Sequence, residues 1–99
     1  MRVISRKRLL QFGAKHPQAA TPLDVWFRIM KATKFAGPDE VVTKFGGQNV
    51  SFLGGELTVF DISGNKYRVV AAVVYDGNAV YIKHVFTHPE YDRWNKKRR

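Results

Sequence analysis

The chain of 99 residues contains no cysteine, which excludes a disulfide framework and thiolate metal sites. This composition is compatible with a reducing compartment, so we expect a cytoplasmic protein. The segment Met1–Arg8 is charged and is not followed by the apolar run of a signal peptide. No stretch approaches the ~20 apolar residues that span a bilayer, so we expect no membrane partner.

Acidic residues are scarce, because 8 Asp and Glu stand against 17 Lys and Arg and leave a net charge of +9. Such a surface attracts polyanions, and nucleic acid is the default polyanion inside a cell. An acidic protein partner, or a role of the charge in solubility alone, are the alternatives. Charge therefore favours a protein that binds nucleic acid or a ribonucleoprotein.

The length suits one domain, since domains typically hold roughly 100–150 residues. We predict a single domain over residues 1–99, with the basic segment 93–99 as a solvated, mobile tail. No internal repeat and no low-complexity segment divides the chain.

The N-terminal half carries helical patterns. Residues 1–5 are a short strand candidate, and Ser5 can cap a helix that Pro17 closes. The run Thr21-Pro22-Leu23-Asp24 has the residues of a helix start, so a turn over 17–21 is expected between two helices. A stripe at i, i+3, i+4, i+7 faces a core and consists of Leu23, Trp26, Phe27 and Met30. A short helix is predicted over 39–45 and a loop over 48–56.

The C-terminal half changes to a β pattern. Strands are predicted over 57–62, 66–75 and 79–87, separated by the turns Ser63-Gly64-Asn65 and Asp76-Gly77-Asn78. These strands form an antiparallel meander. Thr87 and Glu90 have the spacing of a capping box and predict a last helical turn. The sequence therefore predicts an α+β fold, with an N-terminal strand and a two-helix hairpin packed on the meander.

Strand alternation suggests where the chemistry lies. Lys66 and Arg68 share one face, and cations at this spacing stand roughly 6.6–6.8 Å apart, close enough to grip one phosphate. Two charges on a solvated strand end are the alternative interpretation. In the last strand, alternation places His84 and His88 on one face with Val80, Ile82 and Phe86.

The two histidines are too far apart to share a metal easily, and no Cys or HExxH pattern accompanies them, so no metal site is expected. His84, between apolar neighbours, fits a half-buried structural histidine better than a functional one. His88, where the strand ends in an accessible turn, fits a functional role better.

Metal-free RNA cleavage requires a base for the ribose 2′-hydroxyl, an acid for the leaving 5′-oxygen and cations for the phosphorane. His88 can carry out either proton transfer near neutral pH. Tyr91 can stack on a base, or donate a proton if neighbouring cations lower its pKa. Lys66 and Arg68 supply positive charge, so these four residues meet the requirements without a cofactor.

Three segments resemble the HigB-type toxins of bacterial type II toxin–antitoxin operons: Met1–Ser5 with the basic helix after it, Ile62–Val70, and Thr87–Asp92. The position of Tyr81-Ile82-Lys83 also fits. The resemblance spans nearly the whole chain. It implies a RelE-like fold, cleavage of mRNA on the translating ribosome, and inhibition by a co-encoded helix-turn-helix antitoxin.

The resemblance also implies residue roles. Arg68 matches the strand arginine that contacts the scissile phosphate, and Tyr91 resembles the C-terminal aromatic near the cleaved nucleotide. His88 stands about where other members carry a basic residue, and Lys66 falls near their catalytic lysines. Departures from the family pattern are His84, the glycine-rich loop over 46–55 before the sheet, and the extra charge of the tail over 94–99.

We therefore predict that the catalytic residues are Lys66, Arg68, His88 and Tyr91. Contacts to RNA are predicted for Lys83, His84, Asp92 and Arg93, with Asp92 orienting its neighbours and Glu90 capping a helix. A non-catalytic module that binds RNA or the ribosome through the same basic surface is the alternative.

Overall fold

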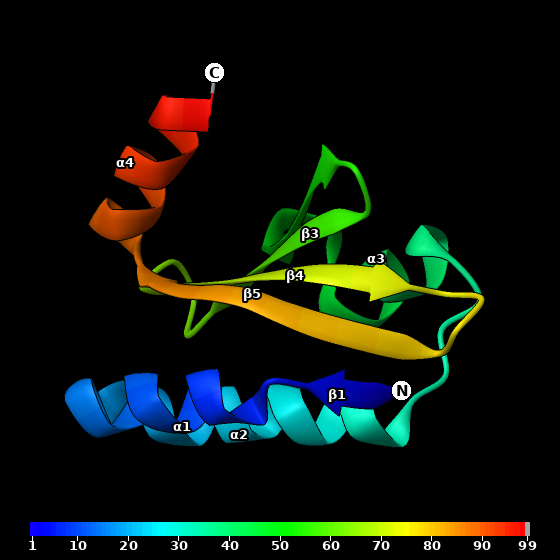
Figure 1. The fold of residues 1–99 in the computed structure, drawn as a ribbon, viewed down its shortest axis with the longest axis horizontal. Coiled ribbons are helices and arrows are strands. Elements are labelled where there is room, and N and C mark those ends of the chain that lie inside the picture. The colour runs from blue at the N-terminus through cyan, green and yellow to red at the C-terminus, as the bar shows by residue number, and fades with distance from the viewer. Residues whose placement is uncertain (99) are drawn as a thin grey trace.

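In the computed structural model, which describes residues 1–98, the chain begins with strand β1 (Arg2–Ile4) and two helices, α1 (Arg6–Lys15) and α2 (Pro17–Ala32). A short helix α3 (Pro38–Phe45) and a 3-10 turn η1 (Gly47–Asn49) follow (Figure 1). The remaining elements in chain order are β2 (Val50–Gly54), β3 (Leu57–Ile62), β4 (Tyr67–Val74), β5 (Ala79–Thr87) and α4 (His88–Arg98).

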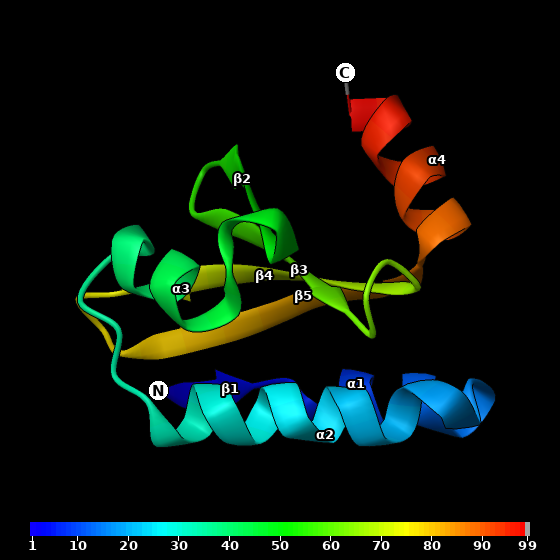
Figure 2. The same cartoon turned by 180° about the vertical axis from the view of Figure 1, so that it is seen from behind.

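The five strands form one mixed sheet in the order β1-β5-β4-β3-β2, in which β1 is parallel to β5 and all other pairs are antiparallel. Helices α1 and α2 lie together along one side of the sheet, and α4 projects from the other side (Figures 1 and 2). The predicted α+β architecture with a helical hairpin and a meander is confirmed. None of the helices within residues 1–98 combines the length and the apolar character that a membrane crossing requires.

The main core lies between the two-helix hairpin and the sheet. The predicted stripe of α2 is buried there, with Leu23, Trp26 and Met30 at most 2% exposed and Phe27 at 9%. Burying such side chains contributes roughly 1.5–3 kcal/mol each. The Trp26 ring meets Phe60 of β3 edge-on at 5.2 Å, so the hairpin is fixed to the centre of the sheet.

The predicted boundary between the two helices is wrong. Helix α2 begins at Pro17, which occupies its first position, and the expected turn over 17–21 is helical. Pro22 lies inside the helix, where its missing N–H leaves the carbonyl of the exposed Gln18 to solvent. Helices α1 and α2 approach closely at Gly13, since a Cβ atom added to this glycine would lie only 3.3 Å from Ala20 of α2. Ser5 precedes α1 in a left-handed conformation and makes no side-chain capping bond, contrary to the prediction.

The segment predicted as a loop over 48–56 is also corrected. It contains η1 and the edge strand β2, which pairs with β3 through a register shift between Phe52 and Gly54. Strand β4 is one residue shorter at each end than predicted, so Lys66 lies in the preceding turn. Helix α4 extends beyond one turn to Arg98, because Tyr91 and Trp94 pack on the sheet. The mobility predicted for 93–99 stays a prediction, and residue 99 lies outside the described residues.

A β-bulge at Lys83 reverses the side-chain alternation of β5. Val70 pairs with His84 while its neighbour Ala71 pairs with Ile82, so Lys83 is the extra residue. Val80 and Ile82 consequently face the main core, whereas His84 and Phe86 face the α4 side. The prediction that all these residues share one face is therefore wrong.

Candidate active site

Helix α4 covers a second, smaller core on the sheet face opposite the helical hairpin. Val59 of β3 and Val70 of β4 are buried there against Tyr91, with Phe86 and Trp94 packed around them. Since all three central strands contribute to this core, α4 is held over the middle of that face.

The first turn of α4 is anchored by the predicted capping box. The Thr87 N–H donates to Glu90 Oε1 at 2.8 Å, and the Glu90 N–H donates to Thr87 Oγ1 at 3.4 Å. The hydrogen bond from the Thr87 N–H lowers the pKa of the Glu90 carboxyl. The His88 N–H donates to the Lys66 carbonyl at 2.9 Å, so the β3–β4 turn is tied to the helix start.

Arg68 is the buried cation of this face, with 9% of the residue exposed. Its Nε lies 3.2 Å from Asp61 Oδ1, and its Nη2 donates to Asn65 Oδ1 at 2.5 Å. Its Nη1 meets the carbonyls of Asn65 at 3.3 Å and of Tyr67 at 3.5 Å. These four contacts occupy all but one of the five guanidinium N–H groups. The guanidinium carbon lies 5.4 Å from the centre of the Tyr91 ring, so the charge is fixed beside that phenol.

Asp61 also belongs to this candidate site, although the sequence pattern did not single it out. It stands directly opposite Arg68 in the β3–β4 pair, and its side chain is 16% exposed. Burial raises the pKa of the Asp61 carboxyl, and Arg68 and His88 offset this rise only in part. The register set by the tight Ser63-Gly64-Asn65 turn was the signal available, because it brings two opposite charges together across the hairpin.

Tyr91 and His88 lie one turn apart on α4. Burial raises the pKa of the Tyr91 hydroxyl, although the nearby charges of Arg68 and Arg98 lower it. The condition set for proton donation by Tyr91, a pKa lowered by neighbouring cations, is therefore not met, and Tyr91 is a neutral phenol near pH 7. His88 Nε2 lies 3.1 Å from Asp92 Oδ2, with the imidazole 40% exposed. The carboxylate of Asp92 is thus placed to fix the ring of an accessible histidine.

Aromatic rings continue from Tyr91 across the same face. The His84 ring stacks on Phe86 with a centroid distance of 5.0 Å and an angle of 13°. Trp94 approaches both, at 5.1 Å from His84 and 5.6 Å from Phe86. Burial is the main cause that lowers the pKa of His84, with contributions from Arg8 and Lys83, so the ring is neutral at pH 7. Trp94 was not predicted, although its spacing of three from Tyr91 on a helix was a signal.

The other predicted residues lie around this face. Lys66 is exposed in the β3–β4 turn. Lys83 is exposed at the bulge, with its ammonium 5.8 Å from the Tyr81 ring centre. Arg93 is exposed on α4, and its charge contributes to the lowered pKa of Glu90. The structure thus brings Arg68, His88 and Tyr91 together and leaves the three exposed cations at the rim. Residues 1–98 contain no group of three or more side chains able to hold a metal.

Comparison with known proteins identifies the family. Residues 19–94 match the HigB toxin family, described as the RelE-like toxic component of a toxin-antitoxin system. The mRNA interferase HigB of Escherichia coli O6:H1 is 30% identical over 93 residues, which cover 94% of this chain and 90% of that protein. The mRNA interferase toxin HigB of Escherichia coli K12 and the mRNA interferase HigB of Shigella flexneri are each 33% identical over 93 residues, which cover 93% of this chain and 88% of theirs. The chain therefore belongs to the HigB family of RelE-like toxins.

Proposed function

We propose that this chain is an endoribonuclease that cleaves mRNA, the activity named for its relatives. The observation that carries the proposal is the buried Arg68, held by Asp61 and Asn65 beside the phenol of Tyr91 and close to the accessible His88. A fixed cation next to groups able to transfer protons is the arrangement that phosphodiester cleavage requires.

The reaction we propose is attack by the ribose 2′-oxygen on the adjacent phosphorus. A base removes the 2′-hydroxyl proton, the new O–P bond forms, and the bond to the 5′-oxygen breaks as that oxygen is protonated. The products are a 2′,3′-cyclic phosphate and a 5′-hydroxyl. His88, the accessible imidazole of the site, is the group we assign to proton transfer, and Tyr91 keeps its proton because burial raises its pKa. Arg68 stabilises the charge of the phosphorane, and Lys66 adds a second cation.

Binding of the RNA uses the aromatic rings and the cations at the rim. The neutral His84 ring, with Phe86 and Trp94, offers stacking surface for unpaired bases. Lys83 and Arg93 are exposed and meet phosphates. The net charge of +9 raises the rate of encounter with any RNA.

We further propose that cleavage takes place in the cytoplasm on mRNA held by the translating ribosome, and that a helix-turn-helix antitoxin neutralises the chain. Support comes from the basic surface, which suits a ribonucleoprotein, and from membership of a family of toxic components of toxin-antitoxin systems.

The test is to map cleavage by the purified chain on mRNA with and without ribosomes. Arg68→Ala should reduce the cleavage rate roughly 10²–10³-fold, because it removes charge stabilisation of the phosphorane. Arg28→Ala is the matched control, since Arg28 is an exposed arginine of α2 with a side chain 78% exposed. Circular dichroism shows whether each variant folds.

Two outcomes would contradict parts of the proposal. Equal cleavage of free and ribosome-bound mRNA would remove the ribosome from the reaction but keep the nuclease. If the double variant Arg68→Ala/Tyr91→Ala folds and inhibits growth as strongly as the parent, the chain is a non-catalytic RNA- or ribosome-binding module.

A further inference from the structure

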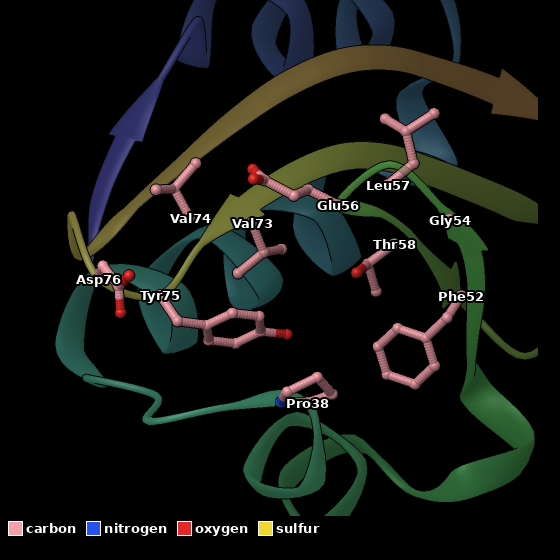
Figure 3. Close-up of a pocket in the computed structure, with 10 residues that line it drawn as sticks. All are labelled: Pro38, Phe52, Gly54, Glu56, Leu57, Thr58, Val73, Val74, Tyr75 and Asp76. Carbon is pink, nitrogen blue, oxygen red and sulfur yellow. The ribbon is translucent and has the colours of Figure 1, made fainter.

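A hollow lies away from the candidate active site, between the start of α3 and the strands β2, β3 and β4. It encloses about 440 Å³, and Figure 3 shows Pro38, Phe52, Thr58 and Tyr75 facing one another around it. Val74 of this hollow and Arg68 of the active site lie at opposite ends of β4, roughly 20 Å apart. A molecule seated here therefore does not touch the residues proposed for cleavage.

The wall of this hollow exposes apolar surface. Phe52 is one of three large apolar side chains that are strongly exposed, with 47% of the residue accessible. The hydroxyl oxygen of Tyr75 is buried, and Thr58 is the polar side chain beside it, whose hydrogen-bonding influence lowers the pKa of Tyr75 while burial raises it more. An exposed aromatic side chain on the wall of an apolar hollow gives a partner's apolar side chain a place to pack.

Strand β2 adds a set of backbone groups to this surface. It is the last strand of the sheet and, within residues 1–98, pairs only with β3. Its outward N–H and C=O groups are therefore free to pair with an extended segment of another chain.

The charge around the hollow is opposite to that of the whole protein. The charged residues that line it are both acidic, although the chain has a net charge of +9. Glu56 and Asp76 line the hollow, and neither takes part in the ion pairs found within residues 1–98. By contrast, Asp24 and Asp61 are paired with arginines. This unpaired acidic rim repels RNA phosphates and attracts a basic protein segment.

We propose that the hollow, its acidic rim and the free edge of β2 form a docking site for an extended segment of the antitoxin. That segment places an apolar side chain against Phe52 and Tyr75, and a neighbouring lysine or arginine meets Glu56 and Asp76. An antitoxin is the occupant we assign, because the family acts as the toxic component of a toxin-antitoxin system and RNA does not fit an acidic rim. The inference rests on family membership and does not depend on the proposed catalytic residues.

The experiment measures binding of the cognate antitoxin, purified separately and titrated into this chain by calorimetry. Every version of the toxin chain, the reference included, carries Arg68→Ala, so toxicity does not limit expression and the result is independent of cleavage. Phe52→Ser should weaken binding at least tenfold, since a central aromatic anchor carries a large share of interface affinity. Glu56→Gln/Asp76→Asn should weaken it about fivefold and reduce its dependence on salt.

Leu10→Ser is the matched control, because Leu10 is 61% exposed on α1, far from the hollow in the fold. It should leave the affinity unchanged. Circular dichroism of each variant checks the fold, and mRNA cleavage by Phe52→Ser with Arg68 restored should equal that of the parent.

Several results would overturn the proposal. One is a Phe52→Ser variant that binds the antitoxin with an affinity within twofold of the parent. Another is a loss of antitoxin affinity that is larger for Leu10→Ser than for Phe52→Ser. A dimer of the chain alone that disappears on Phe52→Ser would assign the hollow to a second copy instead. A loss of RNA affinity on Phe52→Ser would assign it to the substrate.

Discussion

The contact between Asp61 and Arg68 leads to a prediction about how the free energy of unfolding changes with pH, and the sign of that change tests it. Both side chains are mostly buried, at 16% and 10% exposure, so solvent screens the pair only weakly. Replacing Asp61 by Leu leaves a buried guanidinium N–H without its acceptor, which costs about 3 kcal/mol. For a domain of this size the melting temperature should fall by roughly 12–24 °C.

Asp61→Asn should behave differently, because the amide oxygen still accepts a hydrogen bond from Arg68. Burial raises the pKa of Asp61 above 3.8, which means that the folded state binds the proton more tightly than the unfolded state. The parent therefore loses stability from this group as the pH rises from 3.8 through the raised pKa, and the Asn variant does not. At pH 7 we expect Asp61→Asn to lie within about 1 kcal/mol of the parent.

Urea unfolding of the parent and both variants between pH 3 and 8 tests this reasoning. The free energy of unfolding of the parent, relative to Asp61→Asn, should decrease as the pH rises. If it increases instead, Arg68 stabilises the carboxylate by more than burial costs, and the argument is wrong. The rate of cleavage should fall more in Asp61→Leu than in Asp61→Asn, by roughly 10²-fold relative to the parent, because in the Leu variant Arg68 loses the contact that orients it.

Other predictions concern α4 and the bulge. Trp94→Ala should raise the Kd for single-stranded RNA roughly 5–150-fold through lost stacking, measured by fluorescence anisotropy, and an unchanged Kd would contradict the stacking role. Glu90→Ala should cost about 1 kcal/mol at pH 7 in urea unfolding. The pKa of Glu90 is lowered from 4.5, so its contribution to stability is present above pH 4.5 and disappears as the pH falls through the lowered pKa. If Glu90→Ala loses the same free energy of unfolding at pH 3 and at pH 7, this reasoning is refuted. Deleting Lys83 should leave the sheet intact in circular dichroism and keep cleavage, because His84 then follows Ile82 in regular alternation opposite Val70 and Ala71. His84 and Phe86 stay on the site face, and a folded variant that has lost cleavage would contradict this reasoning.

The local elements of the fold could be predicted from the sequence because their signals are local. The stripe of α2, the limits of β5 and the capping box at Thr87 each follow from spacing over a few residues. The edge strand β2 could not, since its five residues, of which the last is a glycine, have no pattern that distinguishes a strand from a loop. Its pairing with β3 is a tertiary contact.

The candidate site was predicted in part. Arg68, His88 and Tyr91 do lie together, and their roles remain proposals. Alternation alone gave the wrong face for His84, because a bulge is invisible to a period of two. Asp61 and Trp94 were missed for a related reason: each gains its meaning from the residue that it meets on another element.

The single extra residue at Lys83 has a consequence for comparing this chain with its relatives. For a relative that lacks the extra residue, an alignment that leaves out this one-residue gap would exchange the core-facing and site-facing residues of the second half of β5. Residue-by-residue transfer of roles across this strand would then assign function to packing positions. Relatives are therefore best superimposed on both sides of the bulge separately, with Val80 and Ile82 as one anchor and Phe86 as the other.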